Sequence, residues 1–91
     1  MTRRQRGVIK TERRRPFRRE FARMFRRRLY VLGTTGRALA AALGVTEAAV
    51  SKWRMGRQVP RLHLENAMFD ALHVNLVDRG MWAELLADCR R

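Results

Sequence analysis

The apolar residues of segment 35–55 recur every three or four positions and are interrupted once by a glycine. This spacing places them on one face of each of two short helices. Gly44 falls between the two helices, where a residue that tolerates positive φ can end the first one. The small side chain of Ala40 allows the second helix to approach closely. The apolar set is Leu39, Ala40, Leu43, Val45, Ala49, Val50 and Trp53.

The segment resembles the helix-turn-helix of the Cro- and lambda-repressor-like proteins, in which two crossed helices share this apolar pattern. Seven positions agree in register, and a glycine, a basic residue and a proline follow, although a plain helical hairpin can show the same pattern by chance. The resemblance covers residues 17–75 and implies a DNA-binding domain. The matching residues are Leu39, Ala40, Leu43, Gly44, Val45, Val50 and Trp53, followed by Gly56, Arg57 and Pro60.

The basic charge of the chain is concentrated at its N-terminus. The sequence has 21 Lys and Arg residues and 8 acidic residues, and residues 1–28 hold 13 of the basic and 2 of the acidic ones. Residues 1–16 show dense charge and no apolar period, so they are expected to form a disordered arm when free. Guanidinium groups suit phosphate contact or insertion into a narrow minor groove. The predicted DNA contacts of the arm are Arg3, Arg4, Arg6, Arg13, Arg14 and Arg15.

The remaining sequence predicts an all-α fold of five helices. An amphipathic helix is expected to start at Pro16 and end before Gly33, and Thr35 and Thr46 are expected to cap the second and third helices. A fourth helix is predicted from Pro60 to Asn75, and a fifth after a cap at Asp78. The expected organisation is a basic arm (1–16), a helix-turn-helix DNA-binding domain (17–75) and a C-terminal helix for dimerisation (76–91). Together the last two form the expected five-helix, lambda-repressor-like fold.

The third helix is predicted to read DNA bases. With its apolar residues facing the core, its opposite face carries Glu47, Ala48, Ser51 and Lys52. In the major groove, Lys52 could donate to guanine, Glu47 could accept from cytosine, and Ala48 could touch a thymine methyl group. The alternative interpretation is an ordinary solvated helix face, on which Glu47 only stabilises the helix dipole.

Phosphate contacts are predicted for five residues that surround the third helix. Such contacts fix the register of a protein on the duplex without reading its sequence. The five residues are Thr35, Thr46, Arg54, Arg57 and Arg61.

A homodimer is expected because one helix contacts only a few base pairs, whereas two related by a twofold axis read half-sites about 34 Å apart. The last helix carries apolar strips wider than a free surface helix needs. Its predicted dimer anchors are Met81, Trp82, Leu85 and Leu86.

No catalytic, metal or cofactor site is predicted. Cys89 is the single cysteine, and His63 and His73 have no acid and nucleophile beside them in the sequence. No apolar run approaches the ~20 residues of a membrane span. We therefore expect a cytoplasmic, nucleoid-associated protein that is not an enzyme.

The function predicted from sequence is transcriptional regulation, as a phage or mobile-element type repressor that binds an operator in double-stranded DNA. One alternative is an antitoxin or another module that binds a protein partner, since antitoxins of this fold also bind DNA. A second alternative is an architectural protein that binds any DNA. RNA binding by the arginine-rich segment is a third, which leaves the helix-turn-helix pattern unexplained.

Overall fold

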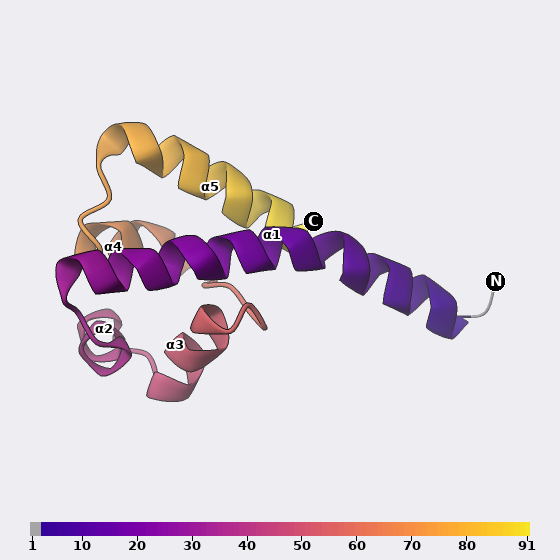
Figure 1. The fold of residues 1–91 in the computed structure, drawn as a ribbon, viewed down its shortest axis with the longest axis horizontal. Coiled ribbons are helices and arrows are strands. Elements are labelled where there is room, and N and C mark those ends of the chain that lie inside the picture. Colours follow the sequence, from indigo (N-terminus) through magenta and orange to yellow (C-terminus); the bar gives the residue numbers. More distant parts are fainter. Residues whose placement is uncertain (1–2) are drawn as a thin grey trace.

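The computed structural model describes the backbone of residues 3–91 and the side chains of residues 14–91. This described part contains five α-helices, one short 3₁₀ turn and no strand, as the sequence predicted. The long helix α1 crosses the molecule, with α2 and α3 on one side of it and α5 on the other (Figure 1). The elements are α1 (Arg3–Leu32), α2 (Gly36–Leu43), α3 (Glu47–Arg54), η1 (Leu62–Leu64), α4 (Glu65–Ala71) and α5 (Leu76–Arg90).

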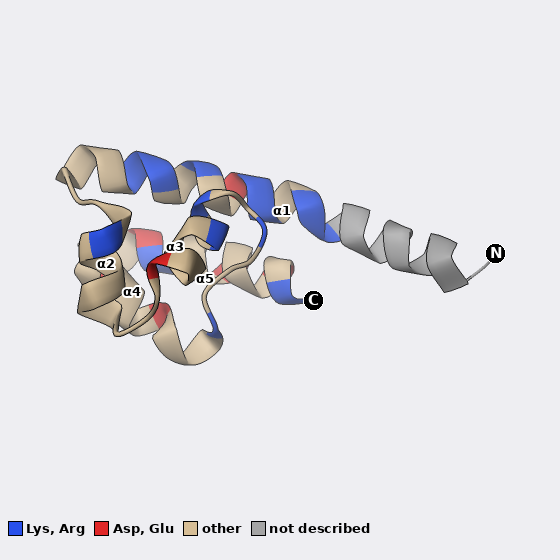
Figure 2. Cartoon of the chain, turned by 90° about the horizontal axis from the view of Figure 1, so that it is seen from below, with Lys and Arg blue, Asp and Glu red and all other residues tan. Residues whose placement is uncertain are grey.

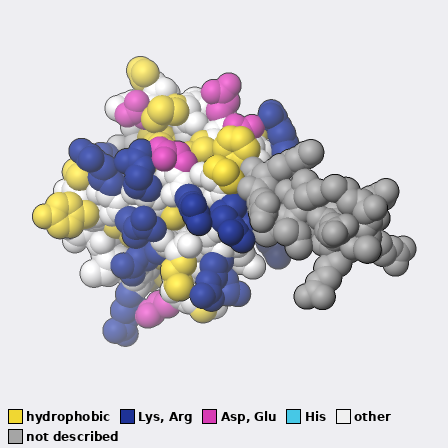
Figure 3. All heavy atoms as spheres, turned by 45° about the vertical axis from the view of Figure 1, so that its right-hand side comes forward, with side chains coloured by type: hydrophobic (Ala, Val, Ile, Leu, Met, Phe, Trp, Pro, Cys, Tyr) yellow, Lys and Arg dark blue, Asp and Glu magenta, His cyan; other side chains and the backbone are white. Residues whose placement is uncertain are grey.

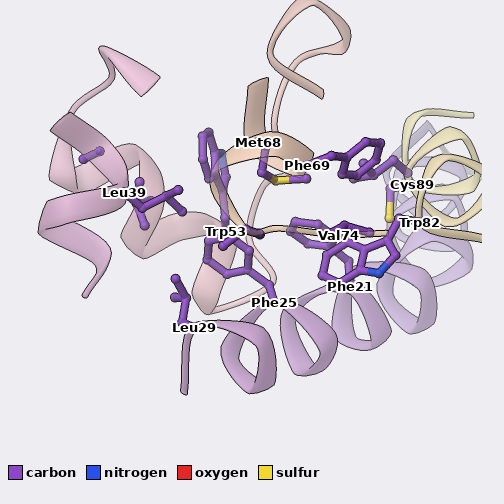
Figure 4. Close-up of a cluster of buried hydrophobic side chains, with 14 residues drawn as sticks. Phe21, Phe25, Leu29, Leu39, Trp53, Met68, Phe69, Val74, Trp82 and Cys89 are labelled. Carbon is purple, nitrogen blue, oxygen red and sulfur yellow. The ribbon is translucent and has the colours of Figure 1, made fainter. Parts of the chain in front are cut away.

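A chain of aromatic rings forms the centre of the core (Figure 4). Phe21 and Phe25 of α1 stack on each other with ring centroids 5.5 Å apart. Phe25 meets Trp53 of α3 edge-on at 6.2 Å, and Phe21 meets Trp82 of α5 edge-on at 6.0 Å. Trp82 also contacts Phe69 of α4 at 6.3 Å. One aromatic cluster therefore holds α1, α3, α4 and α5 together.

The α2–α3 pair forms where the sequence predicted it. The side-chain oxygen of Thr35 accepts a hydrogen bond from the Ala38 backbone N–H at 3.0 Å. Thr46 caps α3 in the same way, accepting from the Ala49 N–H at 3.1 Å. Gly44 ends α2 with a φ of 68°, a left-handed conformation that glycine adopts without steric cost. Both predicted caps and the predicted glycine turn are thus confirmed.

The expectation of a disordered arm is wrong for the described backbone, because α1 begins at Arg3 and continues through Pro16. Proline removes one intrahelical hydrogen bond, but the flanking Arg, Lys, Glu and Gln residues are good helix formers. Arg14 and Arg15 thus lie on a helix rather than on a free arm. The side chains of the other predicted arm contacts, Arg3, Arg4, Arg6 and Arg13, lie outside the described residues.

The boundary between the fourth and fifth helices differs from the prediction. Pro60 precedes a 3₁₀ turn, and α4 itself spans only Glu65–Ala71. Asn75 starts α5 instead of ending α4, because its side chain accepts a hydrogen bond from the Asp78 backbone N–H at 2.8 Å. Asp78 lies in the first turn of α5 and accepts a reciprocal bond from the Asn75 amide at 2.9 Å. The reciprocal pair works like a capping box, which begins a helix three residues earlier than the predicted Asp78 cap.

The structure contradicts two of the four predicted dimer-interface residues. Trp82 and Leu86 are buried in the core of the single chain, so they offer no surface to a second copy. Leu85 is half-buried, and Met81 is exposed. The wide apolar surface of α5 is explained by its packing on α1, which covers most of it within one chain.

Several arginines hold the helices together through backbone carbonyls. Arg28 of α1 donates to the carbonyls of Leu72 and His73, immediately after α4, at 2.7 Å each. Arg90 of α5 donates to the carbonyl of Pro60 at 2.6 Å. The Arg28 contact is favourable because the last carbonyls of a helix lack intrahelical partners, and the Arg90 contact joins α5 to the segment before η1. These two arginines therefore serve the fold.

Two glycines with similar backbones allow a test of how α3 is anchored to α1. Gly44 and Gly56 have φ near 70°, but a Cβ on Gly56 would lie 3.2 Å from the Arg18 carbonyl oxygen of α1, whereas one on Gly44 meets open space. Gly44→Ala should lower the free energy of unfolding by about 1 kcal/mol, the cost of left-handed backbone. Gly56→Ala should lower it further, because the turn must also move away from α1. Urea unfolding followed by tryptophan fluorescence measures both, and equal losses would contradict close packing at Gly56.

Candidate nucleic-acid interface

The four predicted base-contacting residues lie on one exposed face of α3. Val50 and Trp53 are buried on the opposite side of the helix, against α1 and α2. Because the helix has only about two turns, burying this side fixes which residues point outward. We call the exposed residues the α3 outer face; they are Glu47, Ala48, Ser51, Lys52 and Met55.

A shallow hollow separates the start of α2 from the α3 outer face. The two helices approach closely here, since a Cβ on Gly36 would lie 3.3 Å from Val50 Cγ1. Across the hollow, Arg37 Nε lies 3.4 Å from a carboxylate oxygen of Glu47. The hollow is open to solvent and mixed in polarity. Its lining consists of Thr35, Gly36, Arg37, Glu47, Ala48, Val50, Ser51 and Arg54.

Helix α1 borders the same surface through Arg26 and Tyr30. Both residues line a second hollow with Gly36 and Arg54, which also line the first hollow, so the two hollows adjoin. The Arg26 guanidinium donates to the carbonyl of Arg54, the last residue of α3, at 2.6 Å. This bond sets the C-terminal end of α3 against α1, and it leaves the Arg54 side chain exposed.

The five predicted phosphate-contacting residues are all exposed around α3. Thr35 and Thr46 stand at the first turns of α2 and α3, and the hydroxyl of each keeps its O–H donor after accepting the capping bond. Arg54 ends α3, and Arg57 and Arg61 lie on the segment that follows it. Figure 2 shows basic positions at the end of α3 and on the segment that follows it, and further basic positions along α1.

Basic side chains dominate one face of the molecule. Figure 3 shows Lys and Arg side chains spread over the middle of this face, with acidic ones mostly above them. Elsewhere on α1, Arg23 forms an ion pair with Glu20 one turn earlier in the helix. The hydrogen bond from Arg23 lowers the pKa of the Glu20 carboxyl below its ordinary value. The face remains basic because acidic residues are few.

The structure adds three residues that sequence reasoning did not assign to this surface, namely Arg26, Tyr30 and Arg37. Their participation depends on how α1 and α2 pack against α3, and the sequence provides no spacing rule between separate helices. A partial signal was present in Arg15, Arg19 and Arg26, which helical periodicity places on one side of α1. Of these three, Arg26 is the one that contacts α3, through the Arg54 carbonyl.

Within the described side chains of residues 14–91, no group of three or more His, Cys, Asp or Glu residues is placed to hold a metal ion. None of the helices that the structure describes has both the length and the apolar character needed to cross a bilayer. Burial raises the pKa of the Cys89 thiol, which keeps it in the neutral form.

No protein-family model, curated protein or solved structure matches this chain.

Arg26 and Arg27 allow a matched test of the contact between α1 and the end of α3. Both are exposed and adjacent on α1, but Arg26 donates to the Arg54 carbonyl. Arg26→Ala should lower the free energy of unfolding by about 1 kcal/mol more than Arg27→Ala, because a charge-assisted hydrogen bond is lost. Thermal unfolding by circular dichroism measures the difference. Indistinguishable variants would show that the contact does not anchor α3.

Proposed function

We propose that this chain is a sequence-specific double-stranded DNA-binding protein that regulates transcription, as a repressor of phage or mobile-element type. The observation that carries the proposal is the α3 outer face. It exposes Glu47, Ala48, Ser51 and Lys52 together, while the other side of the same helix is fixed in the core. An exposed helix mounted rigidly in this way fits the major groove of B-DNA, which is about 12 Å wide.

The surroundings of α3 suit contacts to the DNA backbone. Exposed arginines follow the helix at positions 54, 57 and 61, and threonine hydroxyls stand at the first turns of α2 and α3. When α3 enters the groove, these groups face the phosphates on either side of it. Contacts of this kind supply affinity and register, and the outer face supplies discrimination between sequences.

The basic N-terminal segment takes part in the proposed complex as a helix. Arg15 and Arg19 lie four residues apart on α1, and both are exposed. A helix presents its guanidinium groups at fixed spacing, so we expect contacts with phosphates along one strand rather than wrapping around the duplex. This element raises affinity for any DNA sequence.

The test is a fluorescence-anisotropy titration with the DNA upstream of the protein's own gene and with scrambled DNA, each at two salt concentrations. Binding should be tighter to the upstream DNA by about 10³-fold, the discrimination typical of specific complexes. Arg57→Ala should weaken binding to both DNAs equally and reduce the log–log salt slope by about 1, because one phosphate contact is lost. Equal, strongly salt-dependent binding to both DNAs would favour an architectural protein instead. Absence of binding to either would refute the proposal.

We also propose that the chain binds DNA as a homodimer through the start of α5. Three large apolar side chains are exposed there: Leu76 is 84% exposed, Val77 87% and Met81 54%. Exposed apolar side chains that cluster on one helix mark contact surfaces more often than single ones do. A twofold contact at this surface keeps Trp82 and Leu86 in the core of each chain.

Charged substitutions distinguish this contact from the core. Val77→Asp with Met81→Asp should convert a dimer into a folded monomer, because these side chains are exposed in the single chain. Trp82→Asp should unfold the protein, since its side chain contacts Phe21 and Phe69. Light scattering gives the mass, and circular dichroism gives the fold. A double variant that remains dimeric would place the interface elsewhere.

A further inference from the structure

Arg37 and Glu47 are brought together only by the fold. Arg37 is the second residue of α2, and Glu47 is the first residue of α3. Packing of the two helices places Arg37 Nε 3.4 Å from Glu47 Oε1. Both residues line the hollow beside the α3 outer face. The pair therefore stands at the surface that we propose enters the major groove.

The fold does not require this ion pair. The two side chains are 86% and 65% exposed. Ion pairs with this exposure contribute little to stability, because water screens the charges and two long side chains must be held in one geometry. The α2–α3 contact is already secured by the buried Leu39, Ala40 and Val50. Because the fold does not depend on the Arg37–Glu47 ion pair, we look for its role in DNA recognition.

The orientation of the ion pair leaves the terminal N–H donors of Arg37 free to contact a DNA base. Its closest approach to Glu47 is through Nε. A guanidinium has five N–H donors, and four of them belong to the two terminal nitrogens. Guanine presents two acceptors in the major groove, O6 and N7, which match two parallel N–H donors. Gly36 and Ala48, beside the pair, have almost no side chain and leave room for a base edge.

The charge of Glu47 also needs a partner at a DNA interface. A lone carboxylate close to phosphates is repelled, whereas one paired with a guanidinium adds no net charge to the surface. We propose, on the basis of the DNA-binding function above, that Arg37 reads a guanine and that Glu47 is the positioning residue that orients it. This assignment replaces the sequence-based one, in which Glu47 reads cytosine directly and Arg37 has no role.

The two residues give variants with opposite effects on general DNA affinity. Arg37→Ala removes the guanine contact and a positive charge, so binding weakens and the preference for guanine at one position falls by about tenfold or more. Glu47→Gln keeps the size of the side chain but removes the negative charge. It should strengthen binding to scrambled DNA while lowering the preference for the same guanine. A residue that acts only through stability would change both affinities in the same direction.

The experiment is selection of bound duplexes from a library of random double-stranded DNA, followed by sequencing. It uses the full-length chain and its Arg37→Ala, Arg37→Lys and Glu47→Gln variants, with circular dichroism to establish that each is folded. Arg61→Ala is the control for charge, since it removes one positive charge at a proposed phosphate contact and should weaken binding to every sequence without changing the motif. The wild-type chain should enrich a motif that contains guanine. Arg37→Ala and Arg37→Lys should lose one guanine of that motif, and Arg61→Ala should keep the whole motif.

The outcomes separate this inference from the function on which it rests. A wild-type chain that enriches no motif overturns the proposed sequence-specific function. A wild-type motif that Arg37→Ala retains in full overturns the assignment of Arg37 and leaves the proposed function standing. A guanine preference that Glu47→Gln retains at the wild-type level overturns the positioning role of Glu47. Loss of the same single guanine in all three variants, with retention in Arg61→Ala, supports the inference.

Discussion

The stacking of Phe21 on Phe25 is the contact from which the rest of this structure is built. These two residues of α1 lie one turn apart, and each meets the edge of a tryptophan from a different part of the chain. Trp53 orients α3 and Trp82 orients α5, so the two sides of the molecule are fixed relative to one helix. Aromatic pairs of this geometry contribute about 0.5–1.5 kcal/mol each beyond the area that they bury. The outward face of α3 is therefore a consequence of the core.

The arginines have two different structural roles, which the count of arginines in the sequence does not reveal. One group, with Arg28 and Arg90, donates to backbone carbonyls and joins helices to one another. The other group is exposed around α3 and includes Arg54, Arg57 and Arg61. Carbonyl-bound guanidinium groups retain their positive charge but have fewer donors left for a phosphate. Net charge therefore does not separate the arginines that join helices from those that stay exposed, whereas the hydrogen bonds and the exposure of the side chains do.

Sequence reasoning succeeded where the cause of a structure is local. The caps at Thr35 and Thr46 and the turn at Gly44 depend on neighbouring residues only, and the periodicity that buries Val50 and Trp53 belongs to one helix. Sequence reasoning failed where one sequence pattern is compatible with two different structures. The apolar surface of α5 could cover either its own chain or a second copy, and packing on α1 decides between them. Dense charge near the N-terminus indicated disorder, although the same residue types favour a helix.

The candidate site was predictable as a set of residues on α3 but not as a set of contacts. Helical geometry alone exposes Glu47 and Lys52 once Val50 and Trp53 are buried. The approach of Arg37 to Glu47 depends on the packing of two helices, and it changes the chemistry expected of both. A wholly basic surface attracts every DNA sequence, so an acidic residue within it lowers general affinity. In the proposed complex, the carboxylate of Glu47 offsets this loss by holding a neighbouring arginine in register with a base, which improves discrimination between sequences.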